Sequence, residues 1–116
     1  MDMVTLKDII TAQERLRGLV LHTPLIYSHT LSRLAHREIF LKLENLQITG
    51  SFKLRGSLNK IQSLAAAGQV TGVVAASAGN HAQGVAYAAW QLGIPATIFM
   101  PQWASISKQL ATEGYG

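Results

Sequence analysis

Lys53 is the residue of this sequence best placed for covalent chemistry. It stands between Phe52 and Leu54, just after a polar stretch (residues 44–50), so we expect it in the first turn of a helix. The positive end of the helix dipole disfavours an ammonium group there, and apolar neighbours act in the same direction. A neutral lysine amine can form an imine with an aldehyde. A single helical lysine is usually a solvated surface group, so Lys53 alone does not establish a site.

A second polar cluster, SAGNH (residues 77–81), stands where a strand is expected to turn into a helix. Amides at the start of a helix bind anions, and Gly79 lacks a side chain that would block close approach. Ser77 and Asn80 add side-chain donors, so the cluster predicts a site for a carboxylate or phosphate. An ordinary loop, in which Asn80 caps the helix and His81 is half-buried, would explain the same residues. The pattern is not a dinucleotide fingerprint.

The elements that must position these clusters alternate between strands and helices. Caps, stops and apolar periodicity predict helices over 5–21, 30–35, 51–67, 81–92 and 105–113, and strands over 25–27, 38–43, 72–76 and 96–100. Ser51 and Ser105 are the expected caps of the helices over 51–67 and 105–113, and Gly68 and Gly93 are expected to end those over 51–67 and 81–92. Such alternation predicts an α/β fold with a parallel sheet flanked by helices. The Ala- and Gly-rich helix over 82–92 should approach that sheet closely.

Composition excludes several classes of function. The chain has 116 residues, of which 48% are hydrophobic, enough for about one packed domain. Ten Lys and Arg against six Asp and Glu are scattered singly, which argues against a nucleic-acid partner. Without cysteine no disulfide or thiolate metal site is expected, and we expect no metal. No apolar run reaches the roughly 18 residues of a membrane span, and residues 1–8 do not resemble a signal peptide, so a cytoplasmic location is expected.

Two runs of sequence together resemble a known family. The run ENLQITGSFKLRG (residues 44–56) is similar to the lysine motif of the threonine dehydratase and serine racemase family, and SAGNHAQGVA (77–86) is similar to its second motif. The dipeptides at 23–24 and 100–101 match lesser landmarks, so the resemblance covers nearly the whole chain. It is closest to threonine ammonia-lyase. The implied cofactor is pyridoxal 5'-phosphate, held in the two-domain, tryptophan-synthase-β-like fold of fold-type II enzymes.

The resemblance implies a role for each candidate residue. Lys53 would form the imine with the cofactor and later take the substrate's α-proton. Phe52 would pack beside the pyridine ring, and Asn80 would donate a hydrogen bond to the ring hydroxyl. Ser77, Gly79, Asn80 and His81 would hold the substrate carboxylate, in agreement with the anion site expected on physical grounds. The implied reaction is elimination of the β-hydroxyl of L-threonine, giving 2-oxobutanoate and ammonia, and of L-serine, giving pyruvate.

Departures from the family pattern leave alternatives open. Serine racemases of the family carry a second serine where this chain has Ala78, which favours elimination over racemisation. Sulfhydrylases of related sequence place Thr and Gly where His81 and Ala82 stand. A serine racemase, another hydroxy-amino-acid dehydratase, or a non-catalytic remnant are the alternatives.

The resemblance also implies that part of the active site lies elsewhere. The family's phosphate-binding loop and the group facing the pyridine nitrogen come after position 116. Residues 1–116 are therefore expected to be an N-terminal fragment, containing the start of the large domain and most of the small domain. The complete enzyme is expected to be a homo-oligomer acting on a small amino acid.

Overall fold

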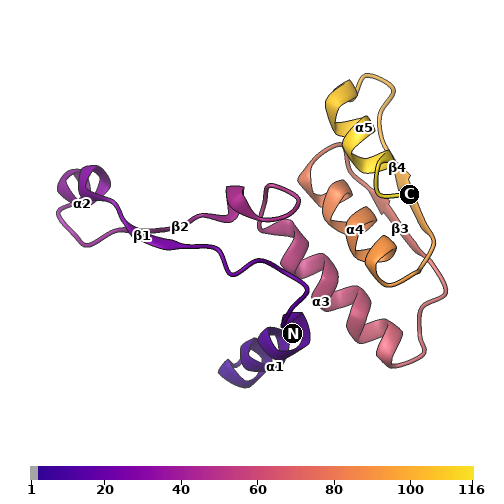
Figure 1. Ribbon diagram of the computed structural model, residues 1–116, viewed down its shortest axis with the longest axis horizontal. Coiled ribbons are helices and arrows are strands. Elements are labelled where there is room, and N and C mark those ends of the chain that lie inside the picture. Colours follow the sequence, from indigo (N-terminus) through magenta and orange to yellow (C-terminus); the bar gives the residue numbers. More distant parts are fainter. Residues whose placement is uncertain (1–2) are drawn as a thin grey trace.

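The chain forms two separate pairs of strands connected by a long helix. The computed structural model describes residues 3–116 (Figure 1). In chain order its elements are α1 (Leu6–Leu16), β1 (Leu25–Tyr27), α2 (His29–Ala35), β2 (Phe40–Lys42), the 3-10 turn η1 (Glu44–Leu46), α3 (Lys53–Ala66), β3 (Val73–Ala76), α4 (Asn80–Gln91), β4 (Ala96–Phe99) and α5 (Ile106–Glu113). Among the described residues, no helix is long and apolar enough to cross a lipid bilayer.

The strands β3 and β4 form the parallel pair that the sequence predicts. Val73 pairs with Ala96 and Ala76 with Phe99, and α4 connects the two strands. Alternate residues of each strand are exposed, so this sheet is covered on one face. The predicted α/β class is therefore confirmed in this part of the chain.

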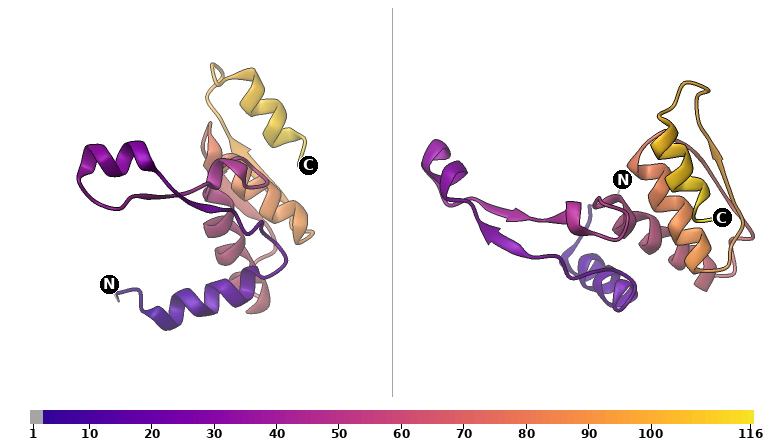
Figure 2. Two further views of the ribbon diagram at one scale, coloured as in Figure 1. Left: turned by 60° about the vertical axis from the view of Figure 1, so that its left-hand side comes forward. Right: turned by 45° about the horizontal axis from the view of Figure 1, so that its top comes forward.

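The other pair, β1 and β2, is antiparallel and forms an arm with α2 at its tip. The arm projects from the rest of the chain in every view (Figure 2). All six residues of β1 and β2 are exposed, although five of them are large and apolar: Leu25, Ile26, Tyr27, Phe40 and Leu41. An exposed apolar ladder of two strands lacks the burial that normally stabilises a sheet.

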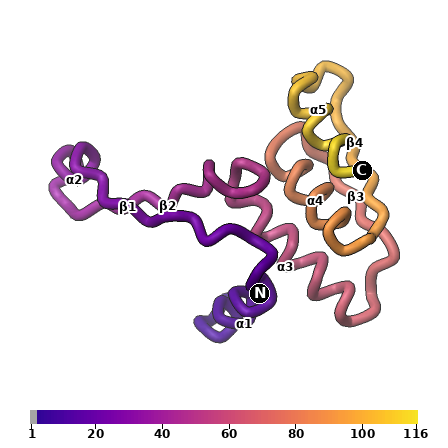
Figure 3. Tube along the Cα trace, in the orientation of Figure 1, coloured from indigo at the N-terminus to yellow at the C-terminus, as the bar shows by residue number. Residues whose placement is uncertain are grey.

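The hydrophobic core lies where α3 crosses α4. Leu54 and Leu58 of α3 are fully buried, together with Ala88 of α4, and Leu16 of α1 closes the cluster. The two leucines of α3 recur at the four-residue spacing of a helix face, which explains why α3 forms over this segment. The trace brings the C-terminus back beside α4 (Figure 3), where the Tyr115 ring lies 5.3 Å from that of Tyr87.

Most predicted helix ends are confirmed, and three details differ. Gly68 and Gly93 have φ of 67° and 65°, the left-handed geometry expected after a helix. The first helix stops at Leu16 rather than at residue 21, because Gly18 (φ 76°) turns the chain and the following apolar residues pack on the core from a loop. Ser51 lies one residue before the N-cap of α3, and its hydroxyl accepts a hydrogen bond from the N–H of Lys53 at 3.4 Å. Ser105 is the N-cap of α5, but its hydroxyl pairs with that of Ser107 and makes no capping bond.

Candidate active site

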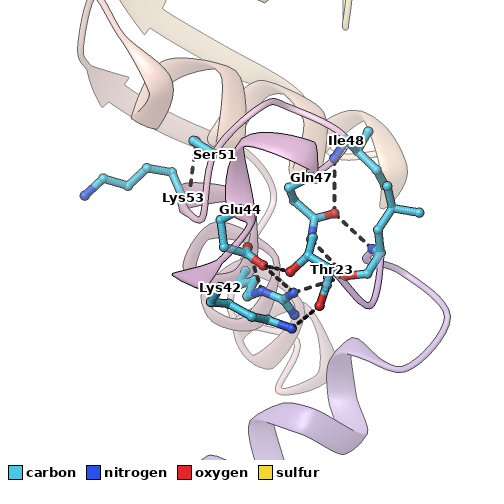
Figure 4. A network of polar contacts seen from close by, with 9 residues as sticks. Thr23, Lys42, Glu44, Gln47, Ile48, Ser51 and Lys53 are labelled. Atoms are coloured by element: carbon cyan, nitrogen blue, oxygen red, sulfur yellow. Dashed lines mark hydrogen bonds and ion pairs between the residues drawn. The ribbon is translucent and has the colours of Figure 1, made fainter. Parts of the chain in front are cut away.

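Lys53 is the first residue of α3, as the sequence predicts, and its side chain is exposed. Its Nζ lies 4.9 Å from the centroid of the Phe52 ring, and within residues 3–116 it has no hydrogen-bond or ion-pair partner. Figure 4 shows the side chain pointing away from the polar network behind it. The expected apolar surroundings are present only in part, because Leu54 turns into the core and leaves Phe52 beside the amine. The amine is thus accessible and unpaired within the described residues.

An ion pair fixes the loop that leads to Lys53. The Arg55 guanidinium donates to both carboxylate oxygens of Glu44, from Nε at 2.8 Å and from Nη2 at 2.7 Å. The Thr23 hydroxyl donates to the same carboxylate at 2.5 Å. These bonds, led by those from Arg55, lower the pKa of Glu44 to about 2. The network joins η1 to the segment before β1 and to the first turn of α3 (Figure 4).

Gln47 makes a second connection within the same loop. Its side-chain amide forms two hydrogen bonds with the backbone of Leu21, accepting from N and donating to O, each at 2.9 Å. Gln47 is almost fully buried, so both bonds are shielded from water. Arg55 Nη2 donates to the same Leu21 carbonyl at 3.0 Å. The backbone before β1 is therefore hydrogen-bonded to the loop that leads to Lys53.

We expect the Glu44 ion pair to make stability depend on acid pH. Because the pKa of Glu44 is about 2 in the folded chain and 4.5 ordinarily, its contribution is complete above about pH 4.5 and is lost as pH falls towards 2. Glu44→Gln should lower the free energy of unfolding by about 1–3 kcal/mol at neutral pH and remove this pH dependence. Urea unfolding at several pH values measures both effects.

Glu14→Gln is the matched control, because Glu14 forms an exposed ion pair with Arg17. It should change stability by less than about 1 kcal/mol. Asp8, whose pKa is lowered by hydrogen bonds from Thr5, is unchanged in both variants. Any pH dependence of stability that comes from Asp8 is therefore the same in both. Equal losses in the two variants would contradict the assigned role of Glu44.

The cluster 77–81 forms the predicted turn between β3 and α4. Ser77 extends the parallel pair by donating its N–H to the Phe99 carbonyl at 3.0 Å, and its hydroxyl accepts from Gly79 N at 3.3 Å. Gly79 is the N-cap of α4, and no side chain caps that helix. The first-turn amides of Asn80 and His81 therefore lie open to an anion. His81 is exposed rather than half-buried.

Gly84 brings the two clusters together. A Cβ placed on it would lie 2.9 Å from Ser57 Oγ and 3.2 Å from the carbonyl carbon and oxygen of Lys53. The small residues of α4 thus allow it to pack closely against α3 at Lys53. The sequence predicts a close approach of this helix only to the sheet. Phe52, Lys53 and His81 line one pocket of about 610 Å³. Ser77, Gly79 and Asn80 lie outside that lining.

We expect Gly84→Ala to separate the clusters. The added methyl group meets helix backbone, so α4 must shift away from Lys53, at a cost of about 1–3 kcal/mol in the free energy of unfolding. Gly56→Ala is the matched control, because nothing lies within 4 Å of a Cβ at Gly56 in α3. It should be neutral or stabilise by up to about 1 kcal/mol. Thermal unfolding of both variants tests the difference in sign.

Comparison with known proteins decides the family. Residues 16–116 match the family described as pyridoxal-phosphate dependent enzymes. The chain belongs to this family. Its members, including the threonine deaminases, use pyridoxal phosphate as cofactor.

The relatives that this chain resembles within the family include lyases and racemases. The L-threonine ammonia-lyase of Thermotoga maritima is 56% identical over 114 residues, which cover 98% of this chain and 28% of the relative. The serine racemase of Dictyostelium discoideum has a TM-score of 0.88 at 42% identity, covering 97% of this chain and 37% of that one. A T.th. threonine deaminase has a TM-score of 0.82 at 42% identity, covering 97% and 35%. The chain spans about a third of the length of the curated relatives that it matches.

The residues at this site fit pyridoxal phosphate. The cofactor and its substrate together need an amine that is free of a carboxylate, an apolar surface for the ring, and donors for the substrate carboxylate. Lys53 supplies the amine, Phe52 is 61% exposed beside it, and the open first turn of α4 supplies amide donors. A pocket of about 640 Å³ between α1 and α3 lacks this combination, because the Lys42 amine on its wall already donates to the Thr23 carbonyl.

Sequence reasoning missed three residues that shape the site. The Glu44–Arg55 pair joins two ends of the lysine motif, and its only sequence signal is that both charges fall within that motif. Lys108 of α5 donates from Nζ to Asn80 Oδ1 at 2.9 Å, across 28 residues of sequence. No spacing rule predicts such a contact, since it depends on how α5 folds back over α4.

Proposed function

We propose that this chain is the N-terminal portion of an ammonia-lyase that converts L-threonine to 2-oxobutanoate and ammonia, and L-serine to pyruvate and ammonia. The observation that carries the proposal is the unpaired amine of Lys53 in the pocket that His81, at the open start of α4, also lines, with α3 and α4 in close contact at Gly84. The similarity to L-threonine ammonia-lyase supports the choice of substrate. We also propose a homo-oligomer for the complete enzyme, with the exposed apolar arm as part of its interface.

Each residue has a defined part in this reaction. Bound pyridoxal phosphate supplies an aldehyde for the substrate amine and a ring that accepts the electron pair left on the α-carbon. Lys53 Nζ would hold the cofactor until the substrate amine displaces it, and the released amine would then take the α-proton. Phe52 would pack beside the ring, and Asn80 would donate from Nδ2 to the ring oxygen. The amides at the start of α4, with Ser77 and His81, bind the substrate carboxylate.

Racemisation is the second candidate, because serine racemases are among the structural neighbours. Adding a proton to the face opposite Lys53 requires a second proton carrier. In the racemases of the family a serine hydroxyl serves this purpose. The present chain has Ala78 at that position, and its methyl group has no proton that can be transferred. Proton transfer from one face favours elimination.

A chimera tests the proposal. This chain replaces the matching 114 residues of the Thermotoga maritima L-threonine ammonia-lyase, which are 28% of that enzyme, so that nearly three-quarters of the chimera come from it. We expect a yellow protein that forms 2-oxobutanoate from L-threonine, with little D-serine from L-serine. The keto acid and the chirality of recovered serine are measured. D-Serine as the main product would indicate a racemase, and a folded but colourless protein would indicate a non-catalytic chain.

A further inference from the structure

Lys108 contacts a residue of the candidate active site from a separate helix. Its ammonium donates to Asn80 Oδ1 at 2.9 Å, so α5 reaches the first residue of α4. The backbone of Lys108 is itself held in place: its N–H donates to the Ser105 carbonyl, and its carbonyl accepts from the hydroxyl of Thr112, which is buried. The lysine stem therefore starts from a fixed point on α5.

This contact determines which end of the Asn80 amide faces outward. A lysine ammonium has three donors and no acceptor, so it can pair only with the amide oxygen. The Nδ2 group of Asn80 must then point away from Lys108, with its two N–H donors free. A hydrogen bond from a cation also polarises the amide, which makes those N–H groups stronger donors.

The charge of Lys108 is unfavourably placed for stability alone. It is the third residue of α5, and its ammonium lies at the first residue of α4, so it faces the positive ends of two helix dipoles. The ion pairs of residues 3–116 are Arg17–Glu14 and Arg55–Glu44, which leaves Lys108 without a carboxylate partner there. Such a placement becomes favourable when an anionic group binds beside it.

We propose that Lys108 is a positioning residue, which holds the Asn80 amide with Nδ2 directed at the ring oxygen of pyridoxal phosphate. The inference rests on the proposed function, because it assigns Asn80 the role of donor to the cofactor. It adds a residue outside both sequence motifs to the site. Lys108 does not touch the cofactor in this arrangement and acts through Asn80.

A double-mutant cycle on cofactor affinity tests this role. The apo form of the chimera is titrated with pyridoxal 5'-phosphate, and binding is followed by tryptophan fluorescence. Lys108→Met keeps the length of the side chain without a donor and should weaken binding roughly five- to tenfold. Asn80→Ala should weaken binding by a similar factor. Lys108→Met in the Asn80→Ala background should add almost no further loss, because the effect passes through Asn80.

Two further variants test the orientation itself. Lys108→Arg retains a donor and should bind the cofactor within about twofold of the parent. Lys108→Glu offers only acceptors, so it should reverse the amide, present Oδ1 to the ring oxygen and give the weakest binding of the set. Lys7→Met, on the exposed face of α1, controls for the loss of one positive charge.

The outcomes separate the two proposals. Additive losses in the double mutant, with the parent fold retained by circular dichroism, would overturn the role of Lys108 and leave the proposed function standing. Coupled losses in a chimera that makes no keto acid would support Lys108 and contradict the proposed reaction.

Discussion

Lys53→Ala in the chimera is expected to lower kcat for L-threonine by at least about 10³-fold, because one substitution removes both the attachment of the cofactor and the acceptor of the α-proton. The visible absorbance of the bound cofactor should disappear as well, since an imine to the protein requires this amine. Release of 2-oxobutanoate and the absorbance spectrum are measured on the same preparation. Ammonia release equal to that of the parent chimera would contradict the assignment of Lys53.

Two variants show whether the position or the charge matters. Lys60→Ala removes an exposed lysine further along the same helix, α3, and should leave the spectrum unchanged. Lys53→Arg keeps a positive charge, but a guanidinium is never neutral in proteins and cannot form the imine. It should be as inactive as Lys53→Ala.

The sequence predicts the local structure around the site because local rules determine it. A strand, a small polar turn and a helix over residues 72–92 follow from periodicity and turn chemistry, and the parallel pair β3–β4 follows from their alternation. Lys53 at the first turn of α3 follows from the same reasoning, and Gly68 and Gly93 end helices as their conformational freedom predicts.

Contacts between distant residues could not be predicted in this way. The approach of Gly84 to the Lys53 carbonyl depends on how α4 crosses α3, which sequence periodicity does not specify. The Glu44–Arg55 pair and the Lys108–Asn80 bond join side chains whose reach and rotamer depend on the packed structure. The sequence predicts the antiparallel arm only as two short strands, since burial patterns give no partner when every residue is exposed.

The chain exposes two apolar surfaces and is less compact than its length predicts. Its radius of gyration is 16.4 Å, against roughly 13 Å for a compact chain of this length. Val74 and Phe99, on the open face of the β3–β4 sheet, are 73% and 62% exposed, and the arm adds a second apolar surface. Surfaces of this kind on both parts of the chain are typical of interfaces with further polypeptide.

The 116-residue chain by itself is therefore expected neither to turn over L-threonine nor to hold pyridoxal phosphate tightly. Lys53 can form an imine with the free aldehyde, as any accessible amine can. The first turn of α4 is assigned to the substrate carboxylate, so the cofactor phosphate lacks the charge-assisted hydrogen bonds that would anchor it. The open sheet face and the apolar arm should cause self-association, with binding of a hydrophobic dye. Sedimentation, dye fluorescence and a cofactor titration with a keto-acid assay measure these properties. A monomer that binds the cofactor at micromolar concentration and releases 2-oxobutanoate would show that residues 1–116 contain the whole active site.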